Sequence, residues 1–174
     1  MKNICLLLVA LFCFSIIGKA QAPVTEIFIV RHADRNGALD ELTAAGIVRA
    51  NELKRVLALS KIDSIFSTNF VRTKQTAQPL ATLNGLPIKI YSDIPQLIRR
   101  ITTYSAKKRV LVVGHSDTAD DLIRQCGCKP PAAIDPQMPG TQFDNLFLVH
   151  VQKIPGQILL KCELIHMKYG VVTN

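Results

Sequence analysis

Residues 27–35 read IFIVRHADR, and this stretch decides the fold. Its first four residues are apolar and mostly β-branched, which is typical of a strand buried on both faces of a sheet. The strand ends abruptly in His32, with Arg31 before it and Arg35 three residues later. Because ligands of open α/β sheets bind outside the carboxyl ends of the strands, we expect His32 to lie in a binding or catalytic site.

Strand patterns alternate with helical patterns along the rest of the chain. A second long apolar strand, residues 108–114, also ends in a histidine, His115. Further strands are expected at residues 62–66 and 87–91, helices at residues 43–60, 73–83, 94–104 and 116–127, and two closing strands at residues 143–151 and 157–165 with a turn at residues 153–156. This order predicts a three-layer α/β/α sandwich around a mostly parallel mixed sheet with an antiparallel edge.

The first predicted helix is amphipathic, and Thr43 is a suitable N-cap. Its inward face is predicted to carry Ile47, Ala50, Leu53, Val56 and Leu57, and Arg49 is expected to point outward. Gly85 is predicted to close the next helix in the left-handed conformation. Four prolines within residues 129–141 indicate an irregular loop.

The first twenty residues have the pattern of a secretory signal peptide. Lys2 precedes an apolar run over residues 4–17, and small residues surround Ala20. The run is too short to span a bilayer comfortably. We therefore expect cleavage after Ala20, a single domain over residues 21–174, no stable membrane insertion, and a periplasmic or secreted location. The alternative is an anchor helix that stays in the mature protein.

Composition narrows the classes of partner. Lys and Arg number 21 against 13 Asp and Glu, so the chain is basic and attracts anions. Aromatic residues make up 6% and Trp is absent, which leaves no stacking platform for nucleic acid. The expected partner is a small phosphorylated substrate or a phosphoprotein, and the oligomeric state stays open.

Three cysteines remain after loss of the predicted signal peptide. In an exported protein we expect Cys162 to pair with either Cys126 or Cys128, which leaves one free thiol. Three cysteines without histidines at ligand spacing make a poor zinc site.

The strand-end rule brings four candidate site residues to the same rim: Arg31, His32, His115 and Arg72, which opens the second predicted helix. Arginine matches phosphate oxygens in pairs, so Arg31 and Arg72 suit a phosphoryl group. A neutral His32 is our candidate nucleophile, because nearby arginines lower the pKa of its ring. His115 is expected to donate to the phosphoryl oxygens.

Three motifs resemble those of the histidine phosphatase superfamily, also called phosphoglycerate mutase-like. They are VRHA at residues 30–33, STNFVRTKQTA at residues 67–77 and VGHS at residues 113–116, and LTAAG at residues 42–46 fits the usual first helix. The resemblance covers residues 25–122 in the order of the family. It implies a transient phosphohistidine on His32, a pocket of Arg31, Arg72 and His115, and no metal or cofactor. Ala33 replaces the usual glycine, as in the short phosphatases of the superfamily.

The resemblance does not identify the general acid. Mutase-type members carry a glutamate where this chain has only Asp93, and the acid-phosphatase branch has His-Asp adjacent where Ser116 intervenes here. The spacing of Arg35 matches that branch, which makes Arg35 a further candidate phosphate ligand. The candidate acids are Asp34, Asp93 and Asp117, each of which also has a simpler structural role in balancing arginines, forming a turn or capping a helix.

The sequence thus predicts an exported phosphomonoesterase, a histidine acid phosphatase-type hydrolase that works through phosphohistidine. Without a strong acid, substrates with good leaving groups, such as phosphohistidine or acyl phosphate, are favoured over alkyl phosphates. The alternatives are a phosphoglycerate mutase-like phosphotransferase and a non-catalytic module that binds phosphorylated ligands.

Overall fold

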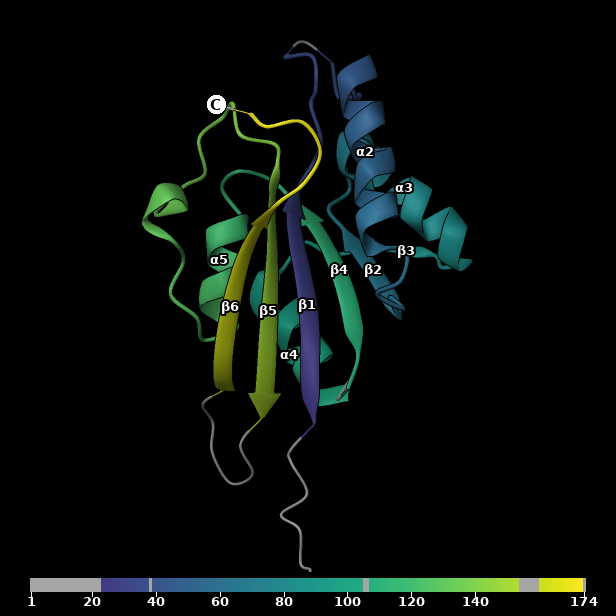
Figure 1. Ribbon diagram of the computed structural model, residues 1–174. Coiled ribbons are helices and arrows are strands. Elements are labelled where there is room, and N and C mark those ends of the chain that lie inside the picture. The colour runs from purple at the N-terminus through teal and green to yellow at the C-terminus, as the bar shows by residue number, and fades with distance from the viewer. Residues whose placement is uncertain (1–22, 38, 105–106, 154–159, 174) are drawn as a thin grey trace, which may run out of the picture.

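The computed structural model describes residues 23–37, 39–104, 107–153 and 160–173. The predicted signal peptide, residues 1–20, and most of the predicted turn between the closing strands lie outside the described residues. The described strands form one six-stranded sheet in the order β3-β2-β4-β1-β5-β6 (Figure 1). Its strands are β1 (Val24–Arg31), β2 (Ser64–Ser67), β3 (Ile88–Ile90), β4 (Arg109–Gly114), β5 (Asn145–Lys153) and β6 (Leu160–Lys168).

The sheet is mixed, as predicted. β1 lies at its centre, parallel to β4 on one side and antiparallel to β5 on the other. β2 and β3 continue the parallel part beyond β4, and β6 closes the antiparallel edge beyond β5. The arrowheads of β1 and β4 therefore point to the same end of the sheet (Figure 1).

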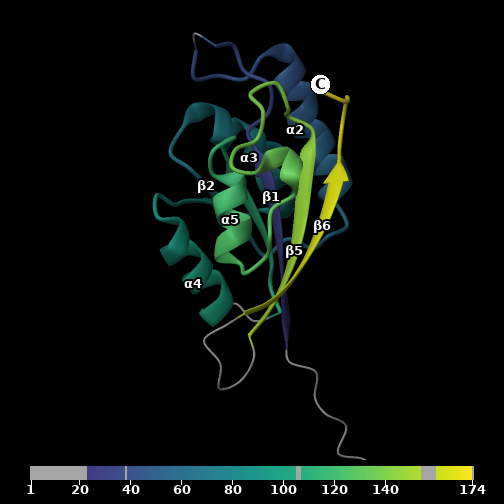
Figure 2. The same ribbon diagram turned by 90° about the vertical axis from the view of Figure 1, so that its left-hand side faces the viewer.

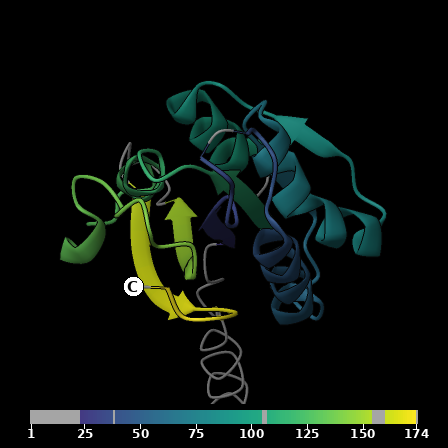
Figure 3. The ribbon, with the colours of Figure 1, turned by 90° about the horizontal axis from the view of Figure 1, so that it is seen from above.

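Helices cover both faces and complete the predicted three layers. They are α2 (Ala44–Leu57), α3 (Val71–Asn84), α4 (Ile94–Tyr104) and α5 (Ala119–Gln125). Phe28 and Val30 face a core shared with α2 and α3, whereas Ile27 and Ile29 face a core shared with α4 and α5. Figures 2 and 3 show these layers from the side and from above. Successive side chains of β1 enter opposite cores, so the strand has no polar face.

The predicted inward face of α2 is partly wrong. Thr43 caps the helix as expected, accepting from Gly46 N at 3.1 Å, but Ile47 and Val56 are 56% and 41% exposed. Arg49, expected outside, is 5% exposed. Its Nε donates to Asp34 Oδ2 at 2.6 Å and its Nη1 donates to two backbone carbonyls near the C-terminus, at positions 169 and 171. These bonds satisfy the buried charge, so Gly46 faces the loop after β1 and Arg49 lies between that loop and the C-terminal residues.

The other elements differ from prediction mainly at their ends. α3 begins at Val71, so Arg72 lies in its first turn, and Gly85 closes it with φ 63° as predicted. α5 begins at Ala119 rather than at residue 116. The proline-rich loop contains a short 3-10 helix, Ala132–Ile134. No helix among the described residues combines the length and apolar character needed to cross a bilayer.

One of the two cysteine pairings expected from the sequence is present. Cys128, just after α5, is joined to Cys162 on β6, with 5.4 Å between the Cα atoms. Cys126 is the free cysteine of the described residues and is fully buried in the core on the α4 and α5 side. Burial raises the pKa of its thiol to about 12.

Gly46 provides a test of how closely α2 packs on the loop after β1. A Cβ at this position would overlap the Asp34 carbonyl oxygen, whereas a Cβ at Gly37 would meet no atom within 4 Å. Gly to Ala in a helix normally stabilises by about 1 kcal/mol. We expect Gly46→Ala instead to lower the free energy of unfolding by about 2 to 3 kcal/mol through overpacking. Urea denaturation measures the change, and Gly37→Ala, expected to stay within about 0.5 kcal/mol, is the control; an equal effect of both substitutions would contradict this packing.

Candidate active site

The parallel pairing of β1 with β4 brings the two candidate histidines together. Arg31 stands opposite Gly114 in the register, and His32 N donates to Gly114 O at 2.9 Å. Each strand thus delivers its histidine at the same level, and the ring centroids of His32 and His115 are 5.5 Å apart. The strand-end prediction is confirmed for this pair.

Hydrogen bonding fixes the tautomer of His32. Its Nδ1 lies 2.8 Å from the backbone oxygen of Ala33, and a carbonyl can only accept, so Nδ1 carries the proton and Nε2 carries the lone pair. The side chain is buried, and burial lowers the pKa of the ring to about 3, with further lowering by the charges of Arg31 and Arg72. His32 is therefore a neutral imidazole near pH 7, with Nε2 available for attack.

His115 is also held in one orientation. Arg72 Nη2 lies 3.3 Å from Nδ1 of His115, and a guanidinium can only donate, so Nδ1 accepts. Nε2 then donates to Thr68 Oγ1, 2.9 Å away. Burial, together with the charge of Arg72, lowers the pKa of this histidine. In this structure the His115 ring orients Arg72, and its proton is directed to Thr68.

Two buried arginine N–H groups have no partner among the described residues. Arg31 Nη1 donates to the carbonyls of Pro139, Gly140 and Gln142 at 3.0, 2.8 and 3.1 Å, but its Nε is buried and unpaired. Arg72 Nη1 is paired with Asp40, and its Nε is likewise buried and unpaired. Burial, followed by the charges of Arg35 and Arg72, lowers the pKa of Arg31 to about 10, which keeps it charged at neutral pH. Unpaired charged donors of this kind suit a bound anion.

Two residues that sequence reasoning missed hold this arrangement in place. Thr76 Oγ1 accepts from Ala33 N at 2.9 Å and donates to Arg72 O at 2.8 Å, so it ties the loop after His32 to α3. Asp40 accepts from Val71 N at 2.9 Å while it pairs with Arg72, and its pKa is lowered, first by the bond from Val71 N. Thr76 lies within the STNFVRTKQTA motif, which could have indicated it. Asp40 lies in a polar loop that gives no such signal.

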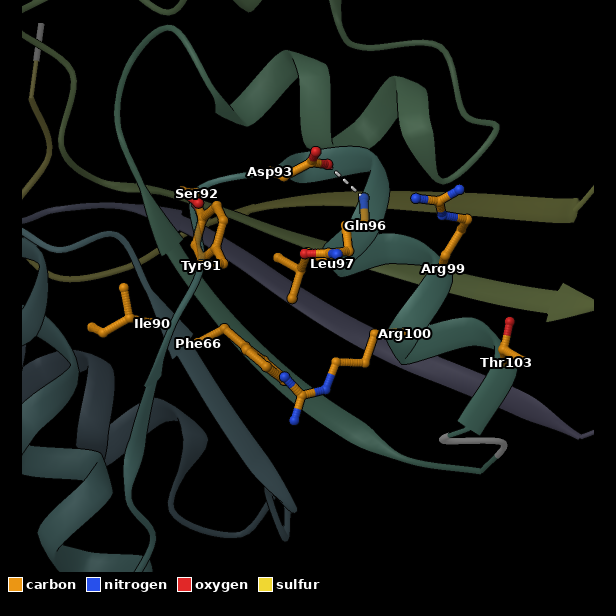
Figure 4. A pocket seen from close by; sticks show the side chains of 10 residues that line it. All are labelled: Phe66, Ile90, Tyr91, Ser92, Asp93, Gln96, Leu97, Arg99, Arg100 and Thr103. Carbon is orange, nitrogen blue, oxygen red and sulfur yellow. Dashed lines mark hydrogen bonds between the residues drawn. The ribbon is translucent and has the colours of Figure 1, made fainter.

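The three candidate acids lie in different surroundings. The Asp34 carboxylate is occupied by Arg49, and Asp93 accepts from Gln96 N at 2.7 Å at the start of α4. Asp93 also lines a groove of about 560 Å³ between α4 and the β3 edge, where Figure 4 shows this hydrogen bond. Asp117 is exposed, and its negative charge offsets a part of the lowering, caused mainly by burial, of the pKa values of His115 and Arg31. Of the three, Asp117 combines closeness to the site with a carboxylate that no described residue binds.

Arg35 stands at the edge of the site. Its side chain is exposed, its backbone bridges to Leu42, and its charge lowers the pKa of Arg31. No group of three His, Cys, Asp or Glu side chains among the described residues is placed to hold a metal ion.

Comparison with known proteins agrees with this fold. Residues 27–95, which include Arg31, His32 and Arg72, match the family model of the histidine phosphatase superfamily (branch 1). No curated protein sequence matches the chain significantly. The chain thus has the fold and the motif segment of the histidine phosphatase superfamily, and the resemblance expected from its sequence is confirmed.

Solved structures with the same fold include several phosphatases. A mycobacterial hydrolase has 15% identity and a TM-score of 0.67, with 86% of this chain and 93% of that one covered. A mycobacterial glucosyl-3-phosphoglycerate phosphatase has 14% identity and a TM-score of 0.64, with 81% and 98% covered. An Agrobacterium tumefaciens protein assigned as a phosphohistidine phosphatase has 20% identity and a TM-score of 0.56, with 82% and 96% covered. At these identities the likeness establishes the fold.

The buried neutral state of His32 predicts a pH dependence of stability. An unfolded histidine has a pKa of about 6.5 and takes up a proton between pH 7 and 5, whereas folded His32 stays neutral until pH approaches 3. The unfolded state therefore binds more protons, and acidification from pH 7 to 5 lowers the free energy of unfolding by about 2 kcal/mol through this residue. Urea denaturation at both values should show this loss reduced by that amount in His32→Asn. Equal losses in the two proteins would mean that His32 is not held neutral.

Proposed function

We propose that this protein is a phosphatase that forms a transient phosphohistidine on Nε2 of His32. One observation carries the proposal: a buried, neutral histidine with a free Nε2 lies beside two charged arginines with unpaired buried N–H groups. Such a site combines a nucleophile with donors for the oxygens of a tetrahedral anion. The family match over residues 27–95 supports it.

The reaction has two displacements at phosphorus. In the first, the Nε2 lone pair of His32 forms a P–N bond while the bond to the leaving group breaks and the leaving group keeps the bonding electrons. In the second, water forms a P–O bond, the P–N electrons return to Nε2, and the proton of the water ends on the released phosphate. Arg31 and Arg72 hold the phosphoryl oxygens in both steps. When those oxygens draw Arg72 from Nδ1 of His115, that nitrogen becomes free to bind a proton and donate it to the same anion.

The surroundings of the acids favour substrates with good leaving groups. Asp34 and Asp93 are engaged elsewhere, and Asp117 is exposed to solvent with no described residue holding its carboxylate. A positioned general acid contributes about 10² to 10⁴-fold to the rate of such reactions. A site without one is expected to hydrolyse alkyl phosphates the most slowly, because their leaving groups need a proton. The phosphohistidine phosphatase assignment of the Agrobacterium protein with this fold is in line with an activated substrate.

A turnover assay tests the proposed activity. The mature protein should hydrolyse an aryl phosphate in the presence of EDTA, and His32→Ala should lose about 10³-fold or more of kcat. Acetyl phosphate should be hydrolysed faster than propyl phosphate, because it departs without help from an acid. Equal turnover by His32→Ala, or propyl phosphate hydrolysed as fast as acetyl phosphate, would contradict the mechanism.

The same assay distinguishes the alternatives. Binding of inorganic phosphate without turnover of any substrate would favour a non-catalytic module. Transfer confined to positions of a phosphoglycerate would favour a mutase.

We further propose that the phosphatase is exported to the periplasm or secreted. The charged start, apolar run and small residues of positions 1–20 support this, as does the disulfide between Cys128 and Cys162, since disulfides persist in oxidising compartments. Export predicts a mature chain that begins at Gln21. N-terminal sequencing of protein recovered from its cells checks it, and an intact Met1 on the folded protein in the cytosol would contradict it.

A further inference from the structure

Four aromatic rings form a continuous row through the candidate active site. Their order is Phe143, His32, His115 and Phe70, with successive ring centroids 5.9, 5.5 and 5.0 Å apart. An arginine lies over each outer ring: Arg31 is 4.1 Å from the centroid of Phe143, and Arg72 is 4.2 Å from that of Phe70. The two phenylalanines therefore flank the histidines and contact both phosphate-binding arginines.

The row is buried at His32 and exposed at its Phe70 end, while Phe143 at the other end is partly buried. His32 is 2% exposed, whereas Phe70 is 45% exposed although it contacts His115 edge to face. Val71, beside Phe70, is 38% exposed, and Leu39, which precedes the Asp40 that binds Val71 N, is 57% exposed. Large apolar side chains exposed together beside a charged site mark a binding surface.

Two polar side chains at this end of the row, Asp40 and Thr68, are already engaged. The Asp40 carboxylate binds Arg72 and Val71 N, and Thr68 Oγ1 donates to Thr73 Oγ1 at 3.1 Å while it accepts from His115. A leaving group rich in hydroxyls would find these acceptors and donors occupied. A flat apolar leaving group does not need those hydrogen bonds, and it gains contact with the Phe70 ring.

We propose that Phe70, with Phe143, forms the surface that receives the leaving group and selects planar aromatic phosphoryl carriers, such as aryl phosphates or N-phosphorylated imidazoles. This inference rests on the proposed phosphatase activity and specifies its substrate class. The leaving ring lies against Phe70 while its bond to phosphorus breaks and the P–N bond to His32 forms. A phenolate keeps the bonding electrons and takes a proton from water, so the step needs no strong acid from the protein.

Two activated substrates that differ in ring content test the inference. p-Nitrophenyl phosphate carries an aromatic leaving group, and acetyl phosphate is activated without a ring. We expect Phe70→Leu and Phe143→Leu each to lower the ratio of kcat/KM for p-nitrophenyl phosphate to that for acetyl phosphate by about three- to tenfold, the contribution of one aromatic contact. The ratio within one variant cancels any loss of folded or active protein.

Leu59→Ala is the control, because Leu59 is a large apolar side chain that is 92% exposed just beyond the end of α2. It should leave the ratio at the wild-type value. An unchanged ratio in both phenylalanine variants, including an equal fall with both substrates, would overturn the inference and leave the phosphatase proposal intact. Wild-type protein that turns over neither substrate would instead overturn the proposed function.

Discussion

The parallel pairing of β1 with β4 is the constraint on which the site depends. Its register sets Arg31 opposite Gly114, so the two histidines that follow these residues emerge side by side. A slip of one residue would move every side chain of the strand to the opposite face. Two unbroken apolar runs, each buried on both faces, hold this register. Gly114 adds a second restriction, because a Cβ there would crowd Thr118 Oγ1, which accepts from His115 N at 2.7 Å.

The same strand ends concentrate positive charge where water is scarce. Arg31 is 6% exposed and is partly balanced by three backbone carbonyls of the loop before β5 rather than by a carboxylate. Arg72 is balanced by Asp40, whose side chain is 40% exposed and so remains in contact with solvent. Neither arrangement occupies every donor, and burial of an unpaired charged donor is unfavourable. An anion between the two guanidiniums would relieve that cost, so the pocket suits the phosphoryl group of the proposed reaction.

The sequence predicts the parts of this structure that depend on local pattern. Strands, helices and the position of His32 and His115 follow from apolar runs with abrupt polar ends. Arg49 shows where such reasoning fails: periodicity assigns a charged residue to the outside, but its partners are Asp34, near in space and 15 residues away, and backbone carbonyls near the C-terminus. Thr68, Thr76 and Asp40 are similarly set by contacts between distant segments. The choice of Cys128 over Cys126 also depends on geometry, since Cys126 lies wholly inside the core while Cys128 faces β6.

The distribution of carboxylates connects the framework to the chemistry. Asp34 holds the loop after His32 through Arg49, and Asp93 accepts from a backbone N–H at the start of α4, so both contribute to folding at positions where an acid was expected. Asp117 is the remaining candidate, exposed to solvent and bound by no described residue, so the proposed phosphatase would favour leaving groups that depart without an acid. Such groups include phenolates, which are aromatic, and carboxylates, which carry no ring. In the proposed reaction, Phe70, exposed beside His115, would receive the aromatic members of this class of leaving groups. The engaged carboxylate of Asp34 and the aromatic row thus both belong to the immediate surroundings of His32.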